Sequence, residues 1–180
     1  MERVPELIVR AMQSRSPHAP LTSKSDPDFG EVWLVWRSDR TEPHWPDGYG
    51  ALTEWLGVID VPGHPQALMS IEWVEYAHPV ERRVSTFEEF RRDFESAPLE
   101  ASEKTRRVFK RAVENLDRVF DNVRAGLRAL EMGGENDELK LSEAWIVKDE
   151  LTLVCTTGTL TLDCLVVNEG LEVHIVEVFP

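Results

Sequence analysis

The chain has 180 residues, 42% of them hydrophobic, and its 33 Asp and Glu against 20 Lys and Arg give a net charge of −13. This length and composition predict a self-sufficient globular chain and argue against general disorder. The negative charge repels phosphate groups, so neither nucleic acid nor an anionic membrane is expected as a partner. The first residues lack the basic start and apolar run of a secretory signal, and no run is long enough to span a membrane, so we expect a cytoplasmic protein.

The charge is unevenly distributed along the chain. Residues 132–180 carry ten Asp and Glu against two Lys and Arg, whereas residues 99–131 carry six against eight. The acidic excess therefore lies on the predicted sheet, which includes the C-terminal segment, and not on the predicted long helix. A surface of one sign attracts a partner of the other sign, so this segment is expected to face a basic partner, although solubility alone also explains such a charge.

The first thirty residues are predicted to form a helix and a flexible connection. Apolar residues recur at helical spacing within residues 2–13. The stretch from Ser14 to Gly30 is rich in Ser, Pro and Asp, which is typical of a mobile connection. We therefore expect residues 1–30 to form an N-terminal amphipathic helix with its connection, and residues 31–180 to form a single α+β domain.

Three strands are predicted next. Residues 31–38 hold an unbroken apolar run, which is typical of a strand that is covered on both faces and lies inside a sheet. Residues 51–61 and 66–77 are β-compatible runs separated by Pro62-Gly63-His64-Pro65. Two prolines and a glycine favour a tight reversal, so these runs are predicted to form a hairpin, although residues 51–56 also allow a helical turn.

Two helices are predicted in the middle of the chain. Ser85 and Glu88 have the spacing of a capping box, which begins a short helix lined on one side by Phe87, Phe90 and Phe94. A long helix is expected over about residues 99–131, before Gly133-Gly134. Its apolar residues alternate spacings of four and three: Phe109, Val113, Leu116, Phe120, Val123, Leu127 and Leu130. Small or apolar neighbours widen this stripe, which favours a helix lying across a sheet over a coiled coil.

The C-terminal fifth is predicted to form an antiparallel meander. Apolar and polar residues alternate from Leu151 to Thr156, from Thr159 to Cys164 and from Leu171 to Ile175, with turn signals between them. Together with residues 139–148 these runs give four strands. The expected fold is therefore α+β: an antiparallel sheet, made of the N-terminal strand, the hairpin and the meander, that the long helix covers on one face.

The first candidate site lies on the polar face of the last two strands. Glu172 and His174 share a face, Glu177 is a further carboxylate in the same strand, and a tight turn after Asp163's strand would place Asp163 directly opposite His174. A carboxylate beside an imidazole can act as a general base or hold half a metal site. No second histidine is near in sequence, so we predict an acidic partner-binding face and no metal.

The second candidate site is the loop between Asp39 and Gly50. It carries polar and aromatic residues that commonly anchor protein interfaces: Arg40, His44, Trp45, Asp47 and Tyr49. Pro46-Asp47-Gly48 also satisfies ordinary turn chemistry, so a plain connection is the alternative.

No motif fixes a reaction. The chain lacks a Gly-x-Ser-x-Gly elbow and a phosphate-binding glycine loop, and Cys155 and Cys164 lie in strand-like contexts that predict free, buried thiols. We therefore expect no catalytic residues and no cofactor, and a module that binds a basic protein, as an immunity-type inhibitor or a chaperone does. The alternative is a small-molecule-binding protein or hydrolytic enzyme with a pocket between the long helix and the sheet. A homodimer is compatible with either.

Overall fold

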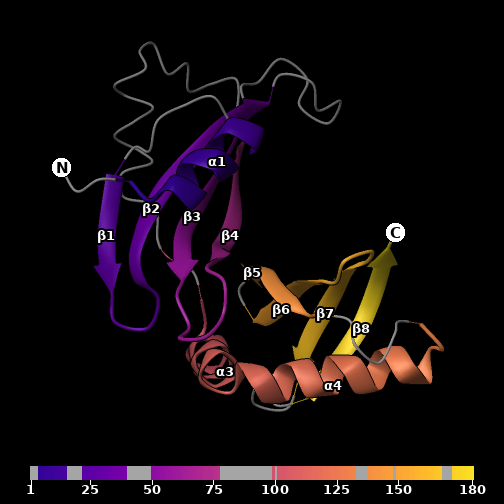
Figure 1. Ribbon diagram of the computed structural model, residues 1–180. Helices are drawn as coiled ribbons and strands as arrows, with labels where there is room; N and C mark the ends of the chain where they lie inside the picture. The colour runs from indigo at the N-terminus through magenta and orange to yellow at the C-terminus, as the bar shows by residue number, and fades with distance from the viewer. Residues whose placement is uncertain are drawn as a thin grey trace, which may run out of the picture. The chain divides into compact units, whose positions relative to one another are not determined.

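The computed structural model describes residues 4–15, 22–39, 50–77, 99, 101–132, 138–147, 149–167 and 172–180 (Figure 1). It has an eight-stranded sheet in which hydrogen-bonded neighbours follow chain order, from β1 to β8. The registers determined for neighbouring strands are antiparallel. The predicted α+β class with an antiparallel sheet is thus confirmed. The chain divides into two compact units, 1–57 with 71–99, and 58–70 with 100–180. The extent of the predicted single domain stays a prediction.

The first unit contains the N-terminal helix α1 (Glu6–Arg15) and most of the strands β2 (Gly30–Asp39), β3 (Gly50–Ile59) and β4 (Ala67–Ala77). These confirm the predicted helix, strand and hairpin, with β3 a strand throughout. Successive residues Val32, Trp33, Leu34 and Val35 are all at most 7% exposed, so β2 is buried on both faces. Ile8 of α1 is fully buried, which makes the helix part of a core.

Strand β1 (Thr22–Asp26) was not predicted from the sequence. It lies within the stretch read as a connection, because an edge strand without apolar residues carries no periodic signal. The register with β2 places Lys24 opposite Val32, and the Lys24 ammonium lies 4.1 Å from the centre of the Trp55 ring, a cation–π contact. The turn that follows is held by the Asp26 carboxylate, which accepts hydrogen bonds from the backbone N–H groups of Asp28 and Phe29.

In place of one long helix, the second unit has two, α3 (Glu103–Glu114) and α4 (Leu116–Ala129). The backbone leaves helical geometry at Asn115 (φ −125°, ψ 37°), and the side-chain amide of Asn115 donates a hydrogen bond to the Arg111 carbonyl at 2.8 Å. The apolar stripe runs through the break, which is why the sequence pattern did not reveal it. Ser102 caps α3 by accepting a hydrogen bond from the Thr105 N–H at 3.2 Å. Leu130, at the end of the predicted stripe, is 52% exposed.

The predicted meander is confirmed as β5 (Lys140–Val147), β6 (Glu150–Thr156), β7 (Thr161–Val167) and β8 (Glu172–Phe179). One face, which we call the inner face, holds buried residues in register, such as Leu153 opposite Cys164 and Cys155 opposite Leu162. Cys155 and Cys164 are free and fully buried, as predicted. A hydrogen bond with Cys164, together with burial, raises the pKa of the Cys155 thiol well above its usual value.

Two contacts position α4 in the second unit. α4 packs on β8 where Gly126 approaches Ile175 so closely that an added Cβ would lie 3.0 Å from the Ile175 Cδ1 atom. The tight turn between β3 and β4 meets α4 through His64, whose Nε2 atom lies 3.3 Å from the Asp117 carboxylate and whose ring contacts the edge of Phe120. None of the described helices is long and apolar enough to cross a membrane.

Candidate functional site

The face of β5–β8 opposite the inner face forms the candidate site, and we call it the outer face. Successive side chains of a strand point to opposite faces, and paired residues of neighbouring strands share one face. The registers therefore place side chains of the outer face in rows across the strands. One row contains Glu143, Val154, Asp163 and Glu177, and the next contains Trp145, Thr152, Leu165 and His174.

The structure corrects the predicted partner of Asp163. Asp163 pairs with Glu177, whereas His174 pairs with Leu165. The prediction assumed a tight two-residue turn and an even ladder, but Val167 pairs with Glu172 and the register shifts between Asp163 and Cys164. The pairing of Val167 with Glu172 shifts the ladder by two residues, and the β-bulge adds one more residue to β8. Together they move Glu177 into the position that we predicted for His174.

All four predicted residues in this segment share the outer face. Asp163, Glu172, His174 and Glu177 occupy alternate positions once the bulge is counted, but the predicted carboxylate–imidazole pair is absent from the register. Partial burial raises the pKa of the Asp163 carboxyl. A carboxylate opposite another carboxylate is a poor arrangement for a sheet, because like charges directly opposite one another are destabilising. The geometry thus resembles an anionic binding surface more than a catalytic pair.

Large apolar side chains on the outer face were missed in the sequence. Trp145 is 40% exposed, Val147 is 49% exposed and Phe179 is 42% exposed, and Val176, at the bulge, is 59% exposed. Trp145 and Val147 alternate with the buried Ala144 and Ile146, so they occupy the polar phase of β5. The tryptophan at a position of β5 where a polar residue is expected was the sequence signal that could have revealed this surface. Exposed aromatic residues among charged ones are characteristic of protein-binding surfaces.

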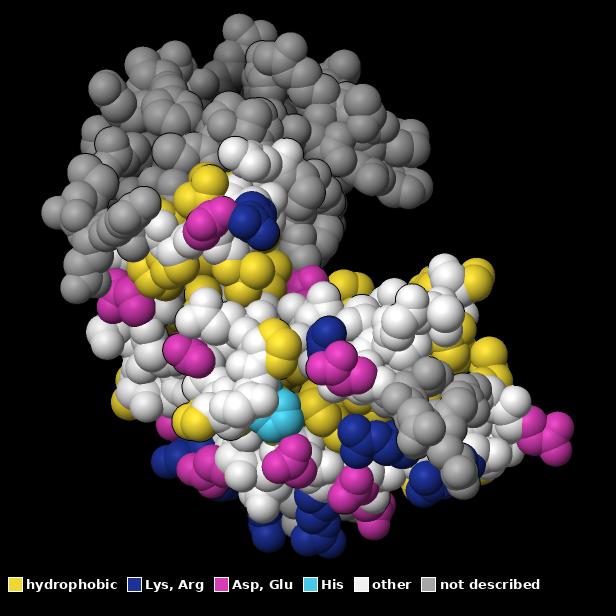
Figure 2. Space-filling model, in the orientation of Figure 1, with side chains coloured by type: hydrophobic (Ala, Val, Ile, Leu, Met, Phe, Trp, Pro, Cys, Tyr) yellow, Lys and Arg dark blue, Asp and Glu magenta, His cyan; other side chains and the backbone are white. Residues whose placement is uncertain are grey.

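The second predicted site, Arg40, His44, Trp45, Asp47 and Tyr49, lies outside the described residues, and so does the predicted helix with Phe87, Phe90 and Phe94. Their role stays a prediction. Within the described part of the chain, no group of three or more His, Cys, Asp or Glu side chains could hold a metal ion. Figure 2 shows Lys and Arg side chains interleaved with Asp and Glu over α3 and α4, at the bottom of the view.

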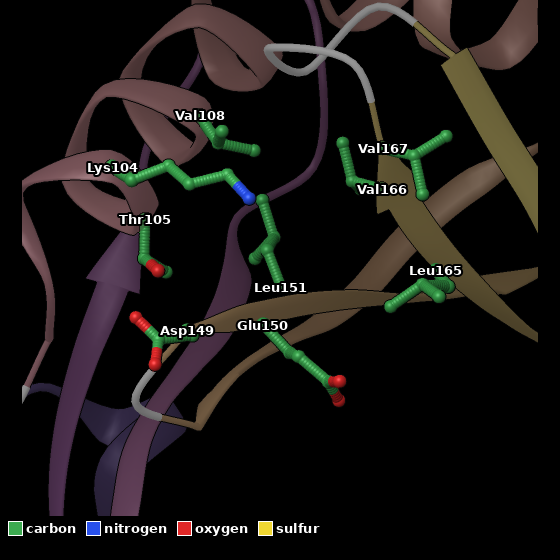
Figure 3. Close-up of a pocket in the computed structure, with 9 residues that line it drawn as sticks. All are labelled: Lys104, Thr105, Val108, Asp149, Glu150, Leu151, Leu165, Val166 and Val167. Carbon is green, nitrogen blue, oxygen red and sulfur yellow. The ribbon is translucent and has the colours of Figure 1, made fainter.

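A cavity of about 410 Å³ lies between α3 and the ends of β6 and β7 in the second unit (Figure 3). Its charged groups are Lys104 from α3 and Asp149 and Glu150 from the turn into β6, and all three are exposed. Its walls are apolar and are formed by Val108, Leu151, Leu165, Val166 and Val167. These charged groups were not predicted as a site, because Lys104 and Asp149 are 45 positions apart in the sequence.

The chain was compared with protein-family models, with curated proteins and with solved structures. None of the three comparisons found a match.

Proposed function

We propose that the chain is an acidic protein-binding module whose outer face binds a basic protein, in the manner of an inhibitor or a chaperone. The row of Glu143, Asp163 and Glu177 is the observation that carries this proposal, since it sets three carboxylates across one face with two of them opposite one another. A basic partner would offset their repulsion on binding. Complementary charge also raises the association rate and the specificity of such a complex.

The exposed apolar residues supply the second component of the proposed interface. Trp145 and Val147 lie on β5 and Val176 and Phe179 lie on β8, the two strands at the ends of the acidic row. Tryptophan is enriched among the residues that dominate binding energy. In our proposal α3 and α4 together cover the inner face, which leaves the outer face for a partner with Lys and Arg around an apolar centre.

Charge reversal on β8 tests the proposal once a partner is captured from the native host at low salt. Replacing Glu172 and Glu177 by Lys should weaken binding by roughly tenfold or more at low salt, because attraction becomes repulsion. The loss should shrink as added salt screens the charges. Surface plasmon resonance across a salt series measures both effects. Trp145→Ala should weaken binding to a similar extent at every salt concentration.

A matched control distinguishes an effect of the outer face on binding from an effect of the net charge. Replacing the exposed Glu114 and Glu131 of the helical segment by Lys changes the net charge by the same amount outside the outer face. Binding should remain close to that of the unmodified chain. Unchanged affinity after reversal of Glu172 and Glu177, or an equal loss in the helix control, would refute the outer face as the binding surface.

A small-molecule site is the second candidate, and the cavity between α3 and β6–β7 favours it. Its volume of 410 Å³ falls within the range of about 300 to 1,000 Å³ that is usual for ligand pockets. Its lining combines apolar walls with a few polar groups, as ligand pockets do. A metabolite screen by thermal shift tests this candidate, and a panel without any stabilising compound would argue against it.

A further inference from the structure

We infer that the cavity between α3 and the β6–β7 strands binds a zwitterion with an apolar body, the chemistry shared by a free apolar amino acid and a dipeptide of apolar residues. The inference rests on the second candidate function, the small-molecule site, and is independent of the protein-binding proposal, because the charged groups that carry it are not those of the acidic row on the outer face. All residues that line the cavity belong to the second unit.

The cation of the cavity is available to a ligand. Lys104 reaches from the first turn of α3 toward Leu151, with its ammonium group over the cavity (Figure 3). No ion pair within 4.0 Å joins Lys104 to Asp149 or Glu150. The neighbouring Thr105 hydroxyl is already hydrogen-bonded to Ser102 at 2.9 Å. Lys104 is therefore the group that a ligand carboxylate would meet.

The anionic side is formed by two consecutive residues at the start of β6. The Asp149 carboxylate points toward the Thr105 side of the cavity, and the Glu150 side chain extends away from Lys104 (Figure 3). Both carboxylates are exposed at the rim. An ammonium group beside Asp149 would gain a charge-assisted hydrogen bond, which is stronger than a bond between neutral groups, and Glu150 adds a second negative charge at the rim.

The walls between these charges select an apolar body. Leu151 and Val166 of the inner face and Val108 of α3 are at most 7% exposed, and each lines the cavity. A ligand with only a carboxylate would leave Asp149 and Glu150 without a counter-charge, and a ligand with only an ammonium group would lie beside Lys104. A zwitterion satisfies both sides while its hydrocarbon part covers the apolar wall.

Ligand analogues with one charge removed test the inference on the full chain. L-leucine and the dipeptide Leu-Leu are titrated and followed by amide chemical shifts, with N-acetyl-leucine lacking the ammonium and leucinamide lacking the carboxylate. We expect at least one zwitterion to shift the amides of Thr105 and Val166, and each analogue to bind roughly tenfold more weakly. Comparing leucine with Leu-Leu distinguishes the two sources of this chemistry.

Matched variants assign each charge to its residue. Lys104→Met should weaken zwitterion binding by roughly tenfold and leave leucinamide binding unchanged. The pair Asp149→Asn with Glu150→Gln should also weaken zwitterion binding, and it should leave N-acetyl-leucine binding unchanged. Lys110→Met and Glu114→Gln, exposed on α3 outside the cavity, should have no effect. The inference is overturned if neither zwitterion shifts the cavity amides at millimolar concentration, or if Lys104→Met binds the zwitterion as the unmodified chain does.

Discussion

Asp163 is the residue at which stability and the proposed function oppose one another. Its carboxyl is partly buried on the outer face, and its register partner is Glu177. Burial raises the pKa of Asp163, so the ionised side chain is less favourable in the folded chain than in the unfolded one. A residue that costs stability at neutral pH while facing solvent is consistent with a role in binding.

Replacing Asp163 by Asn should therefore stabilise the fold at pH 7. A group whose folded pKa is raised binds more protons in the folded state, so its contribution to stability falls as pH rises from about 3.8 through the raised pKa. The urea midpoint of Asp163→Asn should exceed that of the unmodified chain at pH 7, and the gap should close as pH falls toward 3.8. Glu114→Gln serves as the exposed control. If the urea midpoints of Asp163→Asn and of the unmodified chain changed in parallel with pH, this account would be contradicted.

At the scale of elements, the strands with alternating side chains were predictable and the irregular features were not. The meander from β5 to β8 follows from the two-residue period, and β2 follows from its unbroken apolar run. Strand β1 has no apolar alternation, and the break at Asn115 lies within a continuous helical stripe. The bulge in β8 arises from pairing with β7, which no local pattern records.

The same limit applied to the candidate sites. Alternation placed Glu172 and His174 on one face, but only the bulge brings Glu177 onto that face. The partners across the strands depended on the bulge and on the pairing of Val167 with Glu172. The cavity joins Lys104 of α3 to Asp149 at a strand turn, and such a meeting of distant segments is set by tertiary packing alone. Local periodicity in the sequence therefore predicted the outer face of the meander, but it could not predict the cavity between α3 and the β6–β7 strands.

The contact between α4 and β8 yields a prediction at the element scale. Gly126→Ala should gain up to about 1 kcal/mol of helix propensity, but the new Cβ would lie 3.0 Å from the Ile175 Cδ1 atom. Ile175→Val removes that atom. We expect Gly126→Ala to stabilise the Ile175→Val background by about 0.5 to 1 kcal/mol and to stabilise the unmodified chain less, as measured by urea unfolding in a double-mutant cycle.

Ala125 provides the control for that cycle, since it is exposed on the same helix. Ala125→Gly should cost about 1 kcal/mol in both Ile175 backgrounds, because only helix propensity changes. Equal effects of Gly126→Ala in the two backgrounds would show that Ile175 yields freely and that the close approach carries no energetic coupling.

At the scale of the whole molecule, the charge of −13 is a cost that the fold carries in the absence of a partner. Eight Lys and Arg lie among six Asp and Glu in residues 99–131, so the helical segment is nearly balanced, whereas the C-terminal segment is not. Charges of one sign repel one another in the compact state more than in the expanded chain. The repulsion should therefore be stronger on the sheet of the second unit than on its helical segment.

Salt should relieve this repulsion, because at about 150 mM the screening length is only about 8 Å. We expect the urea midpoint of the unmodified chain to rise between about 10 and about 150 mM NaCl, and the triple variant Glu143→Gln, Asp163→Asn and Glu177→Gln to show a smaller rise. The matched triple Glu103→Gln, Glu114→Gln and Glu131→Gln removes the same charge from the balanced helical segment, so it should reduce the rise less. If both triple variants reduced the salt-induced rise equally, the repulsion would come from the total charge and not from the outer face. A urea midpoint that falls with added salt would exclude the repulsion altogether.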